Sequence, residues 1–451
     1  MVSTIVVSRL GRFAVITLAW CMVLTCNGCR SAEILPESPS GANAAVWYEK
    51  ASSSFKEPAD QKLRAEIRSV VSTGWNGEHP ILAGYLRSNE GAILAFKRGA
   101  ELPACDFLKG QPPPRPDGGL RYPKDLTFLA DAVLLEGRKY EKEGKENLAL
   151  KNYLLVLHMA HHLGQERHVT LLGKAWEIYC QGAAYEPLKQ LIQRASFKAE
   201  TLRKTLEDLS KLKSQQVGLE PAFDAERKFL YSVLAVPIGV EIKKRGAEGA
   251  PYAKRAGGLL SAIDRLQEEY AGYLHEAYRR NEPEIFDQKL NGLVQEVKEL
   301  RSFPAQLNLA VQMALVALAD RQKAEDFKNE MMVKILLSSG TPEYGKLITR
   351  FYVGRARMNV LIGAIALRLY KIERGSAPKK LDQLVPSYLQ QLPEDPFGQF
   401  SSLKYVIEKN QWRLYSLGPD RQDQNGTQVL PLGAELENPG DIVFVYPIEL
   451  K

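Results

Sequence analysis

The segment that decides the fold lies at the C-terminal end of the chain. It consists of Pro378 followed by LDQLVPSYLQQLPEDPFG (381–398), LKYVIEKNQWRLYSLGPD (403–420) and GDI (440–442). Apolar and polar side chains alternate at 403–407 and again at 412–416, which predicts two antiparallel strands joined by a short turn. Residues 442–446 are expected to add a third strand. The end of the chain is therefore predicted to contain a small antiparallel sheet.

A long helix is predicted directly before this sheet. Thr341 precedes Pro342 and Glu343, a pattern typical of a helix start, and Gly375 follows the last periodic residue. One apolar stripe runs along this helix, through Met358, Leu361, Ile362, Ile365 and Leu369. Four arginines interrupt its hydrophobicity, at positions 350, 355, 357 and 368. The helix should therefore pack against protein and not cross a membrane.

The order of motifs in the last part of the chain resembles the globular domain of the major pseudopilins of type II secretion. The shared motifs are Pro378 ahead of spaced leucines, the Leu-Pro-x-Asp-Pro-Phe-Gly turn at 392–398, Ser-Leu-Gly-x-Asp at 416–420 and a closing Asp-Ile at 441–442. The resemblance implies an α+β module over 341–451. In that family the long helix continues from a membrane-spanning segment, whereas here a mostly helical region stands in its place. This difference argues against a true pseudopilin subunit.

The resemblance also implies a calcium site. In major pseudopilins the Ser-Leu-Gly-x-Asp loop and acidic residues after it bind calcium, which corresponds here to the carbonyl of Leu417 and to Asp420. Asp423 and Asn425 add oxygen donors to the same loop, and Ca²⁺ prefers such hard, flexible ligands. We therefore expect Leu417, Asp420, Asp423 and Asn425 as metal ligands. The alternative is an ordinary polar turn that binds no metal.

The N-terminus has the pattern of an export signal. Two arginines precede an apolar run at 13–24 that is too short to span a bilayer and has the size of a signal-peptide core. Residues 1–28 are accordingly predicted to be a signal peptide. A small residue directly before Cys29 suits lipoprotein signal peptidase, which would make Cys29 the lipidated first residue. Because Cys26 stands where such a motif usually has Leu, cleavage before Cys26, ordinary secretion and an uncleaved anchor stay open.

Composition defines the remaining organisation. The chain has 451 residues, of which 45% are hydrophobic, and this is enough for two or three domains. Residues 29–45 are rich in Ser, Pro and Gly and are predicted to form a flexible tether, followed by an α-helical domain at 46–340. The net charge of +7 is spread among nearly equal acids and bases without a basic block, so a nucleic-acid partner is not expected.

The central region shows helical periodicity almost throughout. One pair of predicted helices, 125–140 and 145–163, is separated by Gly144 and resembles a tetratricopeptide (TPR) hairpin, with Gly137 and Tyr153 at the positions where such helices approach each other. A solenoid needs at least three stacked repeats, and the sequence contains a single copy. We therefore predict an irregular helical domain with one TPR-like hairpin. Other helices are expected at 59–71, 80–98, 166–193, 198–213, 221–235, 252–279, 283–300 and 304–337.

Two further groups of residues could carry chemistry. Cys105 and Cys180 could form a disulfide in an oxidising compartment, or they could be separate buried thiols. The histidines at positions 158, 161, 162 and 168 resemble a metal cluster, but no complementary ligand motif accompanies them. We expect these histidines to be hydrogen-bonded or exposed, without a metal.

These features favour an exported envelope protein, lipid-anchored and facing the periplasm or the exterior. Its predicted role is a non-enzymatic one, in protein interaction or in association with secretion, with protein partners in the cell envelope and membrane attachment through the lipid. The chain as a whole is similar to uncharacterised exported proteins of planctomycete-type bacteria. The alternative is an exported hydrolase with its site in a groove of the helical domain, although none of the common catalytic motifs is present.

Overall fold

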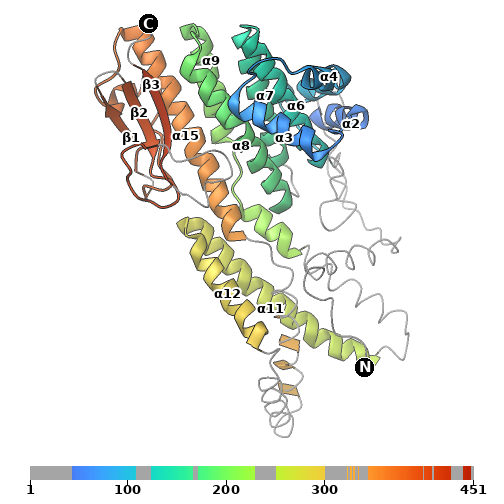
Figure 1. The fold of residues 1–451 in the computed structure, drawn as a ribbon. Coiled ribbons are helices and arrows are strands. Elements are labelled where there is room, and N and C mark those ends of the chain that lie inside the picture. Colours follow the sequence, from blue (N-terminus) through green and yellow to red (C-terminus); the bar gives the residue numbers. More distant parts are fainter. Residues whose placement is uncertain are drawn as a thin grey trace, which may run out of the picture. The chain divides into compact units, whose positions relative to one another are not determined.

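The fold is known from a computed structural model (Figure 1). It describes residues 43–107, 123–165, 171–228, 250–299, 344–399, 401–408, 411–427 and 440–447, together with isolated positions between 322 and 334. These residues do not include the predicted signal peptide, Cys29, His168 or most of the helix predicted at 304–337. The chain divides into two compact units, and residues 349–451 belong to the same unit as the described helices before 219.

Helices dominate both units, and the described strands form one small sheet, so the predicted fold class is confirmed. The helices are α2 (Ala44–Ser54), α3 (Gln61–Thr73), α4 (Pro80–Ser88), α5 (Glu90–Ala100), α6 (Pro123–Lys142), α7 (Glu146–Gln165), α8 (Leu171–Arg194), α9 (Ala199–Ser214), α11 (Ala250–Arg280), α12 (Pro283–Glu299) and α15 (Tyr344–Arg374), with a 3₁₀ turn η2 (Leu381–Leu384). The strands are β1 (Lys404–Ile407), β2 (Gln411–Ser416) and β3 (Ile442–Pro447).

The larger unit is built in successive layers (Figure 1). The sheet lies beside α15, and α15 lies next to α8 and α9. The helices α7 and α6 follow, and α2, α3 and α4 lie on the side away from the sheet. The closest packing joins α7 to α8, α6 to α7 and α2 to α5. The C-terminal module and most of the described helical region therefore share one hydrophobic core.

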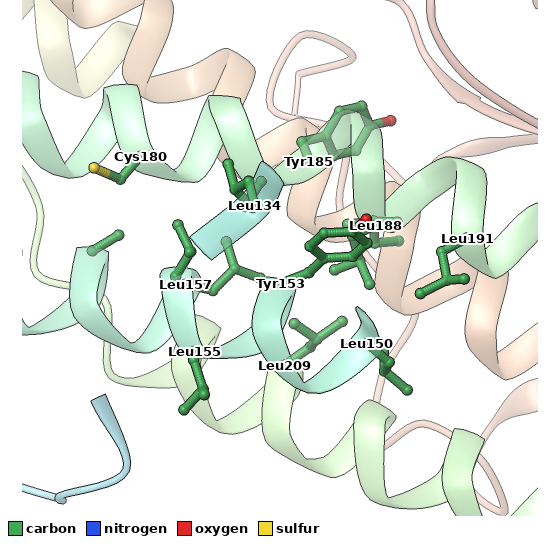
Figure 2. Close-up of a cluster of buried hydrophobic side chains, with 14 of the residues drawn as sticks. Leu134, Leu150, Tyr153, Leu155, Leu157, Cys180, Tyr185, Leu188, Leu191 and Leu209 are labelled. Carbon is green, nitrogen blue, oxygen red and sulfur yellow. The ribbon is translucent and has the colours of Figure 1, made fainter. Parts of the chain in front are cut away.

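The TPR-like hairpin forms as predicted. Helices α6 and α7 are joined through Gly144, whose φ of +71° is one that glycine adopts without a steric cost. Gly137 lies against the ring of Tyr153, where a β-carbon would collide with the aromatic atoms. Figure 2 shows Tyr153 within a buried apolar cluster that also includes Leu134, Leu188 and Leu209, contributed by four helices. The hairpin is thus a central part of the core.

One predicted helix, at 80–98, is in fact two. Helix α4 ends before Asn89, and α5 begins directly after it. The Asn89 side chain is 1% exposed and bonds to both backbone groups of Lys56: it accepts from the N–H at 2.8 Å and donates to the carbonyl at 3.1 Å. A side chain that replaces backbone partners in this way competes with a continuous helix. Apolar periodicity continues across the break, which explains why the sequence pattern predicted one helix.

The sheet has the order β1-β2-β3 and is antiparallel throughout. Trp412 is fully buried, and its ring stacks on Phe444 and Tyr446 of β3 with centroids 5.7 and 5.4 Å away. Gly363 of α15 faces Leu414 of β2 so closely that a β-carbon at position 363 would clash with the leucine side chain. The long helix and the sheet therefore form the predicted α+β arrangement.

Arg368 of α15 holds three elements together. The sequence suggested that this arginine interrupts an apolar stripe, but its side chain is only 3% exposed. Its guanidinium donates hydrogen bonds to the carbonyls of Ile192 and Ala195 at the end of α8, and it lies 4.8 Å from the ring centroid of Tyr446. Helix ends leave carbonyls without intrahelical partners, and Arg368 supplies donors for two of them.

The smaller unit contains α11, α12 and the first residues of α15. Phe286 of α12 is fully buried and contacts Tyr270 of α11 and Tyr344 of α15, with ring centroids 6.5 and 5.7 Å away. The tilted and edge-on geometries of these pairs are the favourable ones for aromatic rings. The helix predicted at 221–235 is described only as far as position 228.

Candidate functional site

The Leu-Pro-x-Asp-Pro-Phe-Gly turn and the Ser-Leu-Gly-x-Asp motif are joined through the side chain of Asp395. This carboxylate is 1% exposed and accepts hydrogen bonds from the N–H of Phe397 at 3.0 Å, the hydroxyl of Ser416 at 2.6 Å and the N–H of Leu417 at 2.9 Å. The Asp-Pro turn at 395–396 therefore fixes the point where β2 ends and the following loop begins. A buried carboxylate is tolerated here because several donors surround it.

The loop after β2 folds around its own acidic residues. Asp420 accepts from the N–H of Gln422 at 3.0 Å and from the side-chain amide of Gln424 at 2.6 Å. Asp423 accepts from the N–H of Asn425 at 2.9 Å and from the hydroxyl of Tyr415 at 3.0 Å. The bonds from Gln422 to Asp420 and from Asn425 to Asp423 each span two residues and form the Asx turns that Asp favours in loops.

Asp441 of the closing motif is brought against this loop from a distant part of the sequence. Its carboxylate accepts from the N–H of Gly426 at 2.8 Å, and its own N–H donates to the side-chain oxygen of Gln424 at 3.1 Å. Gln424 thus connects Asp441 to Asp420. Gly418 also lies against the carbonyl of Gly440, so the two segments approach closely enough to exclude a side chain there.

Electrostatics make Asp441 the unusual member of the group. Its side chain is buried, and its second carboxylate oxygen, Oδ1, has no hydrogen-bond partner among the described residues. Burial raises the pKa of Asp441 to about 6, and the charges of Asp423 and Asp420 contribute to this rise. A nearby cation would favour the ionised form of Asp441 and would give Oδ1 a partner.

The predicted ligands and the observed group overlap only in part. Leu417, Asp420, Asp423 and Asn425 lie in one loop. The N–H groups of Leu417 and Asn425 donate to Asp395 and Asp423, and these bonds do not involve the Leu417 carbonyl or the Asn425 side chain, which are the groups predicted to bind the metal. No group of three or more His, Cys, Asp or Glu side chains is positioned to hold a metal ion in the described part of the chain. Ca²⁺ also takes carbonyl and amide oxygens, so the donor types present are those that fit it.

The Asp-Pro pair at 395–396 predicts a tight turn in which the Asp395 side chain accepts backbone N–H groups, and the bond from the N–H of Phe397 confirms this. The partner of Asp395 at Ser416, 21 residues away, and that of Asp441 at Gly426, 15 residues away, were not predicted. An acidic residue before Pro or Ile gives no local sign of such a partner.

The helical part of the larger unit contains a second buried charged group. Lys174 and Glu177 of α8 are 0% and 1% exposed, with Nζ and Oε2 2.7 Å apart. Lys174 also donates to the carbonyls of Gly164 and Val217 at 3.0 and 2.8 Å, and Glu177 accepts from Gln181 at 3.0 Å. Burial raises the pKa of Glu177. The pair joins three segments of backbone and has the character of a structural crosslink.

Two of the histidines predicted to be hydrogen-bonded or exposed, His158 and His162, have separate partners. His158 bonds to Asp208 of α9, with Nε2 and Oδ2 2.9 Å apart, and His162 bonds to the hydroxyl of Tyr48 at 2.8 Å. Burial lowers the pKa of both His161 and His162 to about 4. Cys105 and Cys180 are free thiols, and burial raises the pKa of Cys180. A disulfide between them is therefore not formed in the structure.

Comparison with known proteins gives no relative. No protein-family model, no curated protein and no solved structure matches the chain. The resemblance to pseudopilins thus stays a prediction that rests on the C-terminal motifs. Among the described helices, none combines the length and apolar character needed to cross a bilayer.

Proposed function

We propose that this protein is an exported, lipid-anchored envelope protein that acts by binding and not by catalysis, and that its C-terminal module takes up calcium. The lipid would be carried by Cys29 and the calcium by the loop at 417–425 together with Asp441. Protein partners in the envelope would then be recognised by the folded unit that the module shares with the helices.

The observation that carries the calcium proposal is the burial of the Asp441 carboxylate beside Asp420 and Asp423. Asp441 is a buried carboxylate whose Oδ1 has no partner among the described residues, and two further acidic residues lie nearby, so its ionised form is unfavourable without a cation. Asp420 and Asp423 already accept hydrogen bonds, but each carboxylate oxygen has lone pairs for a second partner. Bound calcium would supply charge neutralisation at this point, where the ends of β2 and the start of β3 meet.

A binding role is supported by the hydrogen bonds of the buried ionisable groups in the helices, which go to backbone carbonyls. Arg138 is fully buried and donates to the carbonyls of Val71 and Ser72 at the end of α3. Lys174 and Arg368 likewise donate to backbone carbonyls. Groups committed to helix ends in this way stabilise the fold and are poorly placed for proton transfer to a substrate. The alternative of a hydrolase has no comparable observation in its favour.

The test is thermal unfolding of the mature chain at increasing free Ca²⁺, with Mg²⁺ as the ionic control. Binding to the folded state raises stability by about 2.7 kcal/mol at a concentration of 100 times the dissociation constant. Asp441→Asn should be more stable than the parent without calcium, because it removes a buried charge, and should gain less when calcium is added. Asp382→Asn, an exposed acidic residue of the same module, should respond as the parent does.

Two results would contradict the calcium proposal: equal stabilisation by Mg²⁺ and Ca²⁺, or an unchanged calcium response in Asp441→Asn and Asp420→Ala. The lipid proposal is tested separately by mass spectrometry of the mature N-terminus. We expect an acylated Cys29 at the first position, and Cys29→Ser should move the protein to the soluble fraction. An unmodified terminus beyond residue 29 would reject the anchor without affecting the calcium result.

A further inference from the structure

A half-buried aromatic side chain near the start of the described chain lies close to two basic groups. Trp47 of α2 has the Lys50 Nζ 5.3 Å from its ring centroid and the Arg98 guanidinium carbon 5.1 Å from it. Lys50 comes from the same helix as the tryptophan, whereas Arg98 comes from α5. The indole therefore lies near one cation from each of two packed helices, at distances typical of cation–π contacts.

Two large apolar side chains extend this arrangement. Val46 is 49% exposed and Leu94 is 51% exposed. Val46 lies four residues before Lys50, and Leu94 lies four residues before Arg98, so each apolar side chain shares a helix face with one of the basic groups. We call Val46, Trp47, Lys50, Leu94 and Arg98 together the Trp47 patch. It combines aromatic, aliphatic and cationic groups on one exposed surface.

The charges of the Trp47 patch have no ion-pair partner among the described residues. Neither Lys50 nor Arg98 is paired there with a carboxylate, whereas Glu101, three residues beyond Arg98, is paired with Lys151 at 2.6 Å. The patch thus presents two positive charges, and the acidic residue that follows at the end of α5, Glu101, is paired elsewhere. Such a surface suits an anionic partner with an apolar interior.

The chain enters the fold beside this patch. Asn43 caps α2 through a bond to the N–H of Ala45 at 3.1 Å, and its side chain also bonds to both backbone groups of Asp106. The point of entry is therefore fixed three residues before Val46. Residues 30–42 would span at most about 50 Å between Cys29 and this point. A lipid on Cys29 would hold the patch within that distance of the bilayer.

We propose that the Trp47 patch lies on the anionic headgroups of the membrane that carries the lipid anchor. The proposal rests on the proposed acylation of Cys29, which raises the local concentration of headgroups at the patch. Trp is favoured at the level of the headgroups, Val46 and Leu94 can enter the acyl boundary, and Lys50 and Arg98 attract negative lipids. Because α2 lies on the side of the larger unit away from the sheet (Figure 1), the C-terminal module would then face away from the membrane.

The experiment uses the mature chain with Cys29→Ser, produced without residues 1–28, so that neither the acyl chains nor the apolar leader can bind lipid. All described elements begin after this segment. Vesicles of phosphatidylcholine mixed with phosphatidylglycerol carrying brominated chains are titrated into the protein, and tryptophan fluorescence is measured. Bromine should quench Trp47, and Trp47→Phe should remove the quenching although Trp75, Trp176 and Trp412 are retained.

Charge reversal then tests the headgroup contact. Each basic residue near an anionic surface contributes about 1 kcal/mol, so Lys50→Glu with Arg98→Glu should weaken vesicle binding roughly 30-fold or more. Lys379→Glu with Lys404→Glu changes the net charge equally at exposed sites of the C-terminal module and should leave binding nearly unchanged. The apolar contact is tested by Val46→Ser with Leu94→Ser, against Ile407→Ser as the matched control, since Ile407 is 44% exposed on β1.

Absence of quenching with the anionic vesicles would overturn the proposal, as would equal quenching by vesicles of phosphatidylcholine alone or equal weakening in the control variants. The result does not depend on acylation, because the tested chain lacks Cys29. If the titrations show no lipid contact, the proposal of a lipid anchor at Cys29 is unaffected. If mass spectrometry shows an unmodified N-terminus, the titrations still decide whether the Trp47 patch binds lipid.

Discussion

The hydroxyl of Ser416 donates a hydrogen bond to the buried carboxylate of Asp395, with Oγ and Oδ1 2.6 Å apart. This contact joins the Asp-Pro turn before β1 to the end of β2, and the N–H of Leu417 reinforces it with a bond to the other carboxylate oxygen at 2.9 Å. These two bonds connect the Asp-Pro turn to the Ser-Leu-Gly-x-Asp motif, although the two are separated in the sequence. They also fix the point at which the acidic loop at 417–425 leaves β2.

Replacing this carboxylate should therefore destabilise the whole C-terminal module. Asp395→Ala leaves Ser416 and the N–H of Leu417 without an acceptor in a buried position, and we expect a loss of about 3 kcal/mol or more in the free energy of unfolding. Chemical denaturation measures the loss. Asp382→Ala, at an exposed acidic residue of the same module, should change stability by less than about 0.5 kcal/mol. Similar losses in both variants would contradict the role given to Asp395.

Removal of the buried guanidinium of Arg368 should weaken the packing of α15 against the end of α8. Arg368→Met keeps an apolar stem of similar length but leaves the carbonyls of Ile192 and Ala195 without their donors. We expect a loss of about 2 to 4 kcal/mol, together with faster proteolysis near the end of α8. Arg350→Met, at an exposed position of the same helix, is the matched control and should be nearly neutral. Equal behaviour of the two variants would show that the contact is dispensable.

Two helical glycines should respond in opposite directions to the same substitution. A β-carbon at Gly137 would collide with the Tyr153 ring, so Gly137→Ala is expected to cost about 1 to 3 kcal/mol. Gly91 of α5 has open space at the corresponding point, and there alanine should stabilise the protein by about 0.5 to 1 kcal/mol through its higher helix propensity. Denaturation curves of both variants decide the matter. Stabilisation by Gly137→Ala would mean that the hairpin packs differently.

The strands and the TPR-like hairpin were predictable because their signals are local. Alternation at 412–416 reports directly on β2, in which Trp412 and Leu414 are buried. Alternation at 403–407 locates β1, although Ile407 at its end is exposed, and β1 pairs with β2 through Lys404 and Tyr415. A small residue at 137 opposite an aromatic at 153 is likewise a spacing that can be read along two adjacent helices. Local patterns of this kind do not depend on the rest of the fold.

The break at Asn89 and the burial of Arg368 could not be predicted in the same way. Asn89 is decided by a contact with Lys56, and Arg368 by the end of α8, at a sequence distance of 176 residues from Ile192. Polar side chains in an apolar stripe ordinarily indicate a solvated face, and here tertiary structure overrides that rule. The same limitation applies to Asp441, whose environment comes from the turn at Gly426.

Acidification should weaken the fold through His162. Burial, followed by the neighbouring His161 and His158, lowers the pKa of His162 to about 4, compared with about 6.5 in an unfolded chain. Between these values the unfolded state binds a proton that the folded state does not, so the free energy of unfolding should fall as the pH is lowered from about 6.5 to about 4. Above this window the effect vanishes. The shift corresponds to about 3 kcal/mol at most.

His162→Asn keeps an acceptor for the hydroxyl of Tyr48 and removes the titration. The variant should therefore lose less stability than the parent over that pH range, even if it is less stable at neutral pH. Tyr48→Phe should retain most of the pH dependence, because burial and not the hydrogen bond is the main cause of the lowered pKa. Urea denaturation at a series of pH values measures these slopes. A parent and a His162→Asn variant with the same slope would show that His162 does not titrate differently in the folded and unfolded states.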